Sequence, residues 1–150
     1  MKELNEELAI KVRNTIECGL SKGLGKQVPG EMCIEASVCY AYELPHSDNP
    51  PCVGENVRSF KISINDAEWS SNKTRAEGMI KLGIAQLGSN IIDQSEFARK
   101  IKIKVINSIF SILANKYLPE IEGKLKVVDN LKNAIPLLRE LDNKLYSSGF

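Results

Sequence analysis

The feature that most constrains the fold is a set of apolar residues that recur at helical spacing along most of the chain. Near the N-terminus every fourth residue is aliphatic, and charged residues fill positions between. An α-helix brings residues three and four apart onto one face, so this pattern predicts an amphipathic helix that buries one stripe. Glycines at 19, 23 and 25 are expected to end it. The stripe consists of Leu4, Leu8, Val12, Ile16 and Leu20.

A central, buried helix is predicted over residues 31–42. Within 32–42 only Glu35 and Ser37 are polar, and a helix that is apolar nearly all round is normally surrounded by others. Three prolines and several turn-forming residues then prevent its continuation. Residues 44–56 are therefore expected to form an ordered loop.

The pattern over residues 57–67 is ambiguous. Phe60, Ile62 and Ile64 alternate like a strand, whereas Val57, Phe60 and Ile64 fit one face of a helix. A strand needs a ladder partner, and no second strand is recognisable nearby. A helix is therefore predicted.

The second half of the chain is predicted to be helical throughout. Ser70-Ser71-Asn72 caps a helix over 72–87, and a capping box at 93–96 opens a long helix that ends at Leu118-Pro119. The last segment is one long helix or two, because Pro136 kinks or splits it. Together these segments predict an all-α irregular or orthogonal bundle of about five to seven helices, in a single domain over residues 1–150. The two apolar stripes here are Ala76, Ile80, Ile84 and Leu87, then Phe97, Ile101, Val105, Ile109 and Ile112.

The composition argues against several functional classes. With 43% hydrophobic and 26% charged residues, the chain has the composition of a soluble globular protein. No apolar run is long enough to span a membrane, and the charged N-terminus lacks the apolar core of a secretion signal. We therefore expect a cytoplasmic protein, or one in the host cytoplasm if it is viral. A net charge of +1 gives no general attraction to nucleic acid, and the basic cluster at 99–104 has only Phe97 as an aromatic neighbour.

The cysteines and the single histidine carry the main chemical alternatives. Without secretion the thiols are expected to be reduced. Cys33, Cys39, His46 and Cys52 are separated by six, seven and six positions, whereas zinc sites normally contain a closely spaced pair. Buried thiols are thus the preferred interpretation, and no metal or cofactor is expected. A Cys–His nucleophile is the alternative, with Cys52 as the most accessible thiol.

Glu35 is the carboxylate whose environment is predicted to be most unusual. Burial in an apolar helix raises the pKa of a carboxyl group unless a cation pairs with it. Glu31 precedes it by one helical turn on the same face and would repel it. A structural ion pair with Lys26, Arg58 or Arg75 is favoured over a functional acid.

The polar run around Trp69 contains most of the remaining candidates. An indole among polar neighbours can close a pocket or anchor an interface, although a tight turn that caps the next helix explains the run more simply. The glycine-rich stretch 19–26 lacks the spacing of a phosphate loop and is interpreted as a helix end. The expected ligand or partner site, near the loop 44–56 and the segment 65–75, comprises His46, Arg58, Asn65, Asp66, Trp69 and Arg75.

Six short blocks of sequence form a set, namely Lys26–Ala36, Leu44–Asp48, Cys52–Val53, Arg58–Ile62, Asn65–Ser71 and Ile84–Ser89. Together they resemble an uncharacterised group of bacterial or phage helical proteins. The resemblance covers residues 25–115 and implies a helical protein of bacterial or phage origin. It implies no activity.

The sequence therefore predicts a small intracellular binding or interaction module, more in keeping with a non-enzyme than an enzyme, that recognises a protein or a small anionic ligand. Arg58, Arg75 and the amide groups at the start of helix 72–87 would hold an anion. The alternative is a small hydrolase or transferase that uses Glu35 or His46 as a base and Cys52 as a nucleophile. A phage-type inhibitor and a structural subunit are further alternatives, and a homo-oligomer is compatible with the sequence.

Overall fold

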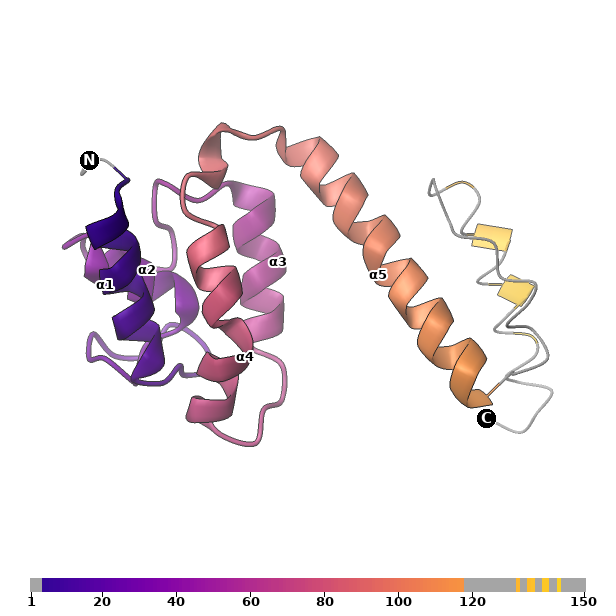
Figure 1. The fold of residues 1–150 in the computed structure, drawn as a ribbon, viewed down its shortest axis with the longest axis horizontal. Coiled ribbons are helices and arrows are strands. Elements are labelled where there is room, and N and C mark those ends of the chain that lie inside the picture. Colours follow the sequence, from indigo (N-terminus) through magenta and orange to yellow (C-terminus); the bar gives the residue numbers. More distant parts are fainter. Residues whose placement is uncertain (1–3, 118–131, 133–134, 137–138, 141–142, 144–150) are drawn as a thin grey trace. The chain divides into compact units, whose positions relative to one another are not determined.

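The computed structural model describes residues 4–117 and, beyond them, residues 132, 135–136, 139–140 and 143 (Figure 1). Within these residues the chain forms five α-helices, one 3-10 turn and no strand, which confirms the predicted all-α fold. The chain divides into two units, residues 1–94 and 95–150. The single domain predicted for the whole chain stays a prediction. The predicted last helix, with its break at Pro136, lies largely outside the described residues.

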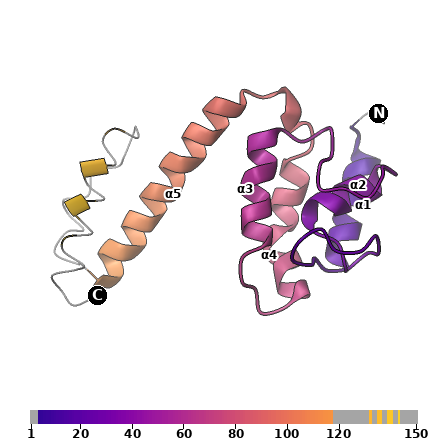
Figure 2. The same cartoon turned by 180° about the vertical axis from the view of Figure 1, so that it is seen from behind.

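The first unit is a bundle of four helices. α1 (Glu6–Glu17) packs against α2 (Ile34–Ala41) and α4 (Asn72–Ala85), and α2 also contacts α3 (Glu55–Asn65) and α4. Both views of the ribbon show α3 and α4 side by side (Figures 1 and 2). Both α2 and α4 contact the other three helices of the unit, and seven of the eight residues of α2 are buried, in keeping with the prediction of a buried helix there. The 3-10 turn η1 (Ser89–Ile91) follows α4.

The α1 stripe enters the core largely as the periodicity predicts. Leu8, Val12, Ile16 and Leu20 are buried, whereas Leu4 at the start of the stripe is exposed. Asn5 caps the helix, and its side-chain oxygen accepts a hydrogen bond from the amide of Leu8 at 2.9 Å. Each buried aliphatic side chain contributes about 1.5–3 kcal/mol relative to an exposed one, so the four together hold α1 to its neighbours.

The buried face of α3 differs from the predicted one. The segment is helical, as predicted, but its buried residues are Val57, Lys61 and Asn65, whereas Phe60 and Ile64 are half-buried. The spacing of four residues puts the three buried positions on one face. The sequence did not reveal this face, because lysine and asparagine normally lie in solvent.

The buried face of α4 also differs in part from the prediction. Ala76 and Met79 are buried together with Gly83, while Ile80 and Ile84 of the predicted stripe are half-buried. Because the buried positions include an alanine and a glycine, α4 can approach its neighbours closely. The residues that α4 buries are therefore less apolar than the aliphatic residues of the predicted stripe.

A hairpin-like loop joins α1 to α2 and contributes one residue, Gln27, to the pocket described below. Gly25 and Met32 make an isolated antiparallel bridge. Gly25 has a φ of +71°, and a Cβ atom there would collide with the carbonyl of Glu31, so both conformation and space require glycine. The loop ends at Cys33, whose Sγ caps α2 by accepting the amide of Ala36 at 3.3 Å.

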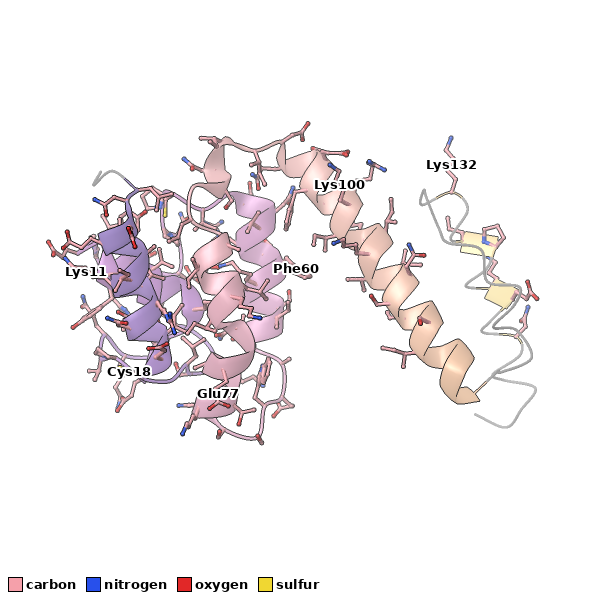
Figure 3. All side chains as sticks on the ribbon, viewed as in Figure 1. Lys11, Cys18, Phe60, Glu77, Lys100 and Lys132 are labelled. Carbon is pink, nitrogen blue, oxygen red and sulfur yellow. The ribbon has the colours of Figure 1, made fainter. Side chains whose placement is uncertain are left out.

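α5 (Gln94–Tyr117), the long helix that the sequence predicts, belongs to the second unit except for its first residue. Lys100 projects from this helix, as Figure 3 shows. Three residues of its predicted stripe, Val105, Ile109 and Ile112, are exposed. No helix in the described part of the chain combines the length and the apolar character that a membrane crossing requires.

Candidate functional site

Arg75, a predicted ligand contact, lies inside the protein. Its side chain is only 5% exposed. Its Nε donates to the carbonyl of Asn65, and its Nη1 donates to the carbonyl of Leu20 and to Oδ1 of Asn72, each at 2.8 Å. The guanidinium therefore ties the end of α3 and the start of α4 to the loop after α1, and it presents no group to a ligand in solvent.

Asn65 is the second part of this network. It is 1% exposed, and its Oδ1 accepts the amide of Ile34 at 3.3 Å. Its Nδ2 donates to the carbonyl of Ser21 and to Oδ1 of Asp66, both at 2.9 Å. Asp66 in turn accepts the amide of Gly23 at 2.9 Å. The structure thus places Asn65, Asp66 and Arg75 close together, and each of them forms hydrogen bonds to other groups of the protein.

Trp69 and the residues after it form a turn and a helix cap, which was the simpler interpretation of the polar run around Trp69. The indole Nε1 donates to the carbonyl of Ile64 at 3.0 Å, and its ring lies against Gly78 of α4. Ser71 caps α4, with its Oγ accepting the amide of Thr74 at 3.0 Å. The cap is confirmed, and the indole nitrogen is already satisfied.

Glu35 is buried and paired, but none of the three predicted partners forms the pair. Its Oε1 accepts from Nζ of Lys61 at 2.5 Å, and the side chains are 0% and 2% exposed. Lys26 instead pairs with Glu31, which is exposed and lies outside α2. Burial raises the pKa of Glu35 against the opposing effect of Lys61, and burial lowers the pKa of Lys61. Oε2 of Glu35 makes no hydrogen bond within the described structure.

The thiols follow the buried interpretation with one correction. Cys33, Cys39 and Cys52 are buried, and Cys18 is the exposed thiol. Cys52 is 4% exposed, so its predicted accessibility is wrong. The prolines before it place its backbone in a loop, but the side chain turns into the core. Burial raises the pKa of Cys39 to about 12, which keeps that thiol protonated.

The remaining candidates do not share a cleft. Nε2 of His46 lies 3.0 Å from the carbonyl of Gly25, and Arg58 is half-buried on α3. Glu35 and Trp69 both bond to α3, at Lys61 and at the carbonyl of Ile64, whereas His46 bonds to the loop before α2. None of the three lines the pocket described next. No group of three or more His, Cys, Asp or Glu side chains in the described part of the chain is placed to hold a metal ion.

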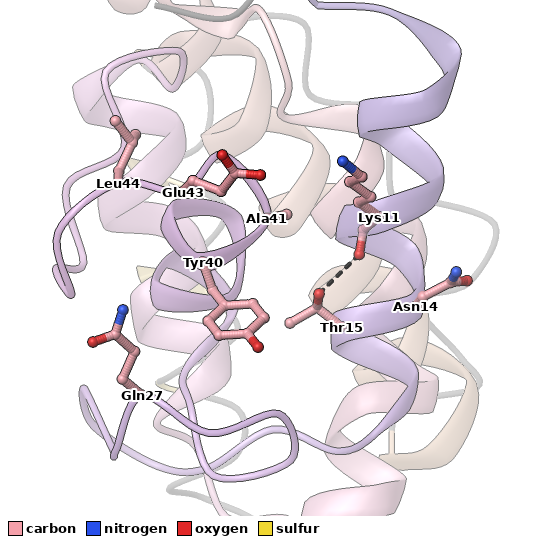
Figure 4. A pocket seen from close by; sticks show the side chains of 8 residues that line it. All are labelled: Lys11, Asn14, Thr15, Gln27, Tyr40, Ala41, Glu43 and Leu44. Carbon is pink, nitrogen blue, oxygen red and sulfur yellow. Dashed lines mark hydrogen bonds between the residues drawn. The ribbon is translucent and has the colours of Figure 1, made fainter.

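A pocket of about 630 Å³ lies instead between α1 and the end of α2, and we call it the α1–α2 pocket (Figure 4). Its volume is within the range typical of small-molecule sites. α1 supplies one wall, α2 and the two residues after Tyr42 supply another, and the loop before α2 supplies Gln27. The lining residues are Lys11, Asn14, Thr15, Gln27, Tyr40, Ala41, Glu43 and Leu44.

Glu43 gives this pocket a strained wall. Its φ is +59°, and it is the single non-glycine residue with positive φ in the described structure. Its amide donates to the carbonyl of Tyr40 at 3.0 Å, and the amide of Leu44 donates to that of Cys39 at 2.9 Å. These bonds form a Schellman motif, which normally has glycine at this position. A left-handed non-glycine residue costs about 1–3 kcal/mol, and such strain is concentrated at functional sites.

The pocket was not predicted from the sequence because its lining residues come from three separate segments. A partial signal was present at the end of the predicted helix 31–42, where a glutamate stands in the position that glycine usually occupies after a helix. Lys11, Asn14 and Thr15 also share one face of the first helix, beside its apolar stripe. Neither signal identifies a pocket without the packing of α1 on α2.

No protein-family model, curated protein or solved structure matches the chain. The resemblance to bacterial or phage helical proteins therefore stays a prediction.

Proposed function

We propose that the protein is a non-enzymatic binding module, and that its binding site is the α1–α2 pocket. The observation that carries the proposal is Glu43, because a strained glutamate forms the wall of the pocket at a position where glycine would be more stable. A binding role gives a reason for retaining the side chain there. The ligand is a small molecule with an anionic group or a segment of a partner protein, and Lys11 supplies the cation.

The enzymatic alternative has less support. A thiol nucleophile needs an accessible thiolate beside a base, and Cys52 is buried. Glu35 is neutralised by Lys61 in the same interior. The reduced state of the described cysteines fits the proposed cytoplasmic location.

The proposal is tested by screening small carboxylates, amines and short peptides against the ¹⁵N-labelled full chain by NMR. Binding should shift the amide resonances of residues 11–15, 27 and 40–44. Lys11→Ala should weaken the best ligand, whereas Arg13→Ala should not. Arg13 is a matched control, because it is an exposed cation on the same helix that pairs with Glu17 and does not line the pocket. Hits that shift only the residues of the segment 65–75 would contradict the proposal and restore the predicted site.

A further inference from the structure

We infer that the α1–α2 pocket binds a hydroxylated carboxylic acid of monosaccharide size, such as a hexuronate, in which a ring with several hydroxyl groups carries one carboxylate. This inference rests on the proposed function and specifies the class of its ligand. It follows from the side chains that line the pocket together, which include one cation, two amides and one exposed aromatic ring.

The uncharged polar groups of the pocket match the hydroxyl groups of such a ligand. Asn14 and Gln27 line the pocket with side-chain amides, and both residues are exposed. An amide presents a donor beside an acceptor, and two neighbouring hydroxyl groups on a sugar ring do the same. The hydroxyl group of Thr15 donates to the carbonyl of Lys11 at 2.8 Å, which leaves its oxygen to accept a further hydrogen bond.

Tyr40 provides a flat apolar surface in the same pocket. It is 39% exposed, and Figure 4 shows its ring between the side chains of Gln27 and Thr15. Ala41 and Leu44 add apolar surface. In a pyranose the C–H groups lie on the faces of the ring and the hydroxyl groups surround its edge. One face can therefore pack on the aromatic ring while the edge reaches the amides.

Lys11 is the cation that would hold the carboxylate. Its partner within the protein is Glu7 at 3.4 Å, and the two side chains are 48% and 77% exposed. A surface pair of this kind is weak, so a ligand carboxylate can take the place of Glu7. One lysine matches a single carboxylate, whereas phosphate sites often combine several cations or helix N-terminal amides. Glu43 is already engaged in an interaction within the protein, so it is assigned no contact with the ligand.

Three probes separate the features of the ligand. Methyl β-D-glucuronide has the carboxylate, the hydroxyl groups and the C–H faces. Methyl β-D-glucoside lacks the carboxylate, and cyclohexanecarboxylate lacks the hydroxyl groups. Titration of the ¹⁵N-labelled full chain with the glucuronide should shift the amide resonances of residues 11–15, 27 and 40–44. The glucoside should bind roughly fivefold more weakly, the loss expected for one exposed ion pair. Cyclohexanecarboxylate should bind roughly tenfold more weakly, because several hydrogen bonds are lost.

Three variants assign each feature to a side chain. Lys11→Ala should remove the preference for the glucuronide over the glucoside. Gln27→Ala should weaken both sugars and leave the affinity for cyclohexanecarboxylate unchanged. Tyr40→Leu should weaken all three probes, since each of them packs a ring on this side chain.

Each polar variant has a matched control outside the pocket. Arg13→Ala removes an exposed cation from the same helix as Lys11, and Val28→Ala truncates an exposed neighbour of Gln27. Both should leave the three affinities unchanged. Circular dichroism of each variant establishes that it is folded before the comparison is made.

Two results would overturn the inference. The first is that the glucoside or cyclohexanecarboxylate binds in the pocket as tightly as the glucuronide. The second is that the glucuronide leaves the pocket resonances unmoved while another compound shifts them, in which case the proposed function stands without this ligand class. If no compound of the wider screen shifts these resonances, the proposed function fails as well.

Discussion

Replacing Lys61 by methionine tests whether the buried ion pair behaves as its surroundings require. Methionine fills a similar volume but leaves Glu35 alone in a site where it is fully buried. Its Oε2 already makes no hydrogen bond within the described structure, so the variant carboxylate loses its one described partner. Removing one member of a buried pair costs about 3–5 kcal/mol. Since domains of this size are stable by about 5–15 kcal/mol, Lys61→Met should lose a large fraction of its stability at neutral pH.

The double variant Glu35→Leu/Lys61→Met is the matched control. It removes both charges and replaces them with apolar groups of similar volume. Exchanging a buried ion pair for apolar side chains is often neutral, or stabilising by about 1–4 kcal/mol. The double variant should therefore be at least as stable as the parent protein and clearly more stable than the single one.

The single variant should also depend on pH in a defined direction. Burial raises the pKa of Glu35, and Lys61 is the main opposing influence, so its removal leaves the raised pKa uncompensated. In the unfolded chain the carboxyl ionises near its ordinary pKa of about 4.3. Between this value and the raised one the folded state binds more protons, so stability falls as pH rises. The deficit of Lys61→Met relative to the parent should shrink between pH 7 and pH 5.

Urea unfolding followed by circular dichroism at 222 nm measures all three proteins. The slope of the free energy of unfolding against urea should be unchanged, so that shifts of the midpoint report stability. A loss below about 1 kcal/mol for Lys61→Met, the range of an exposed ion pair, would refute the burial argument. So would a double variant that is as unstable as the single one.

Three further predictions follow from individual contacts. Glu43→Gly should raise the free energy of unfolding by about 1 kcal/mol because it removes the left-handed strain, and a lower value in urea would contradict this. Gly78→Ala would put Cβ 2.5 Å from Cη2 of Trp69. The free energy of unfolding should therefore fall by about 1–3 kcal/mol, less the gain in helix propensity, and the indole fluorescence should shift. Unchanged emission together with higher stability would refute the contact. Arg99 donates hydrogen bonds to Glu96 and lowers the pKa of that carboxyl group to about 2. The carboxyl NMR shift of Glu96 should therefore titrate near this pH in the parent protein and at a higher pH in Arg99→Gln. Equal titration midpoints in the two proteins would exclude the pair.

Much of the helical architecture could be predicted from the sequence because helix signals are local. The Ser71 cap, the apolar stripe of α1 and the nearly all-apolar α2 each depend on residues within a few positions of one another. The buried face of α3 is an exception, because Phe60 and Ile64 are only half-buried there. The spacing was compatible with a strand or with a helix that buries Val57, Phe60 and Ile64, and packing in the bundle instead buries the helix face that contains Lys61.

The candidate site was predicted less well than the fold. Asn65, Asp66 and Arg75 do gather in space, but they bond to backbone groups of segments far away in the chain. Polar side chains of this kind look alike in sequence whether they bind a ligand or tie loops together. Their burial, which the tertiary structure sets, separates the two roles.

By itself the sequence determined where helices form and how several of them begin and end, because propensity, periodicity and capping act over about one helical turn. Only the tertiary structure decided which partner neutralises Glu35, 26 residues away on another helix. It also decided that Lys11, Tyr40 and Glu43 face one pocket. Such pairings depend on how helices pack in space, and no local pattern of residue types encodes the distance between two helices.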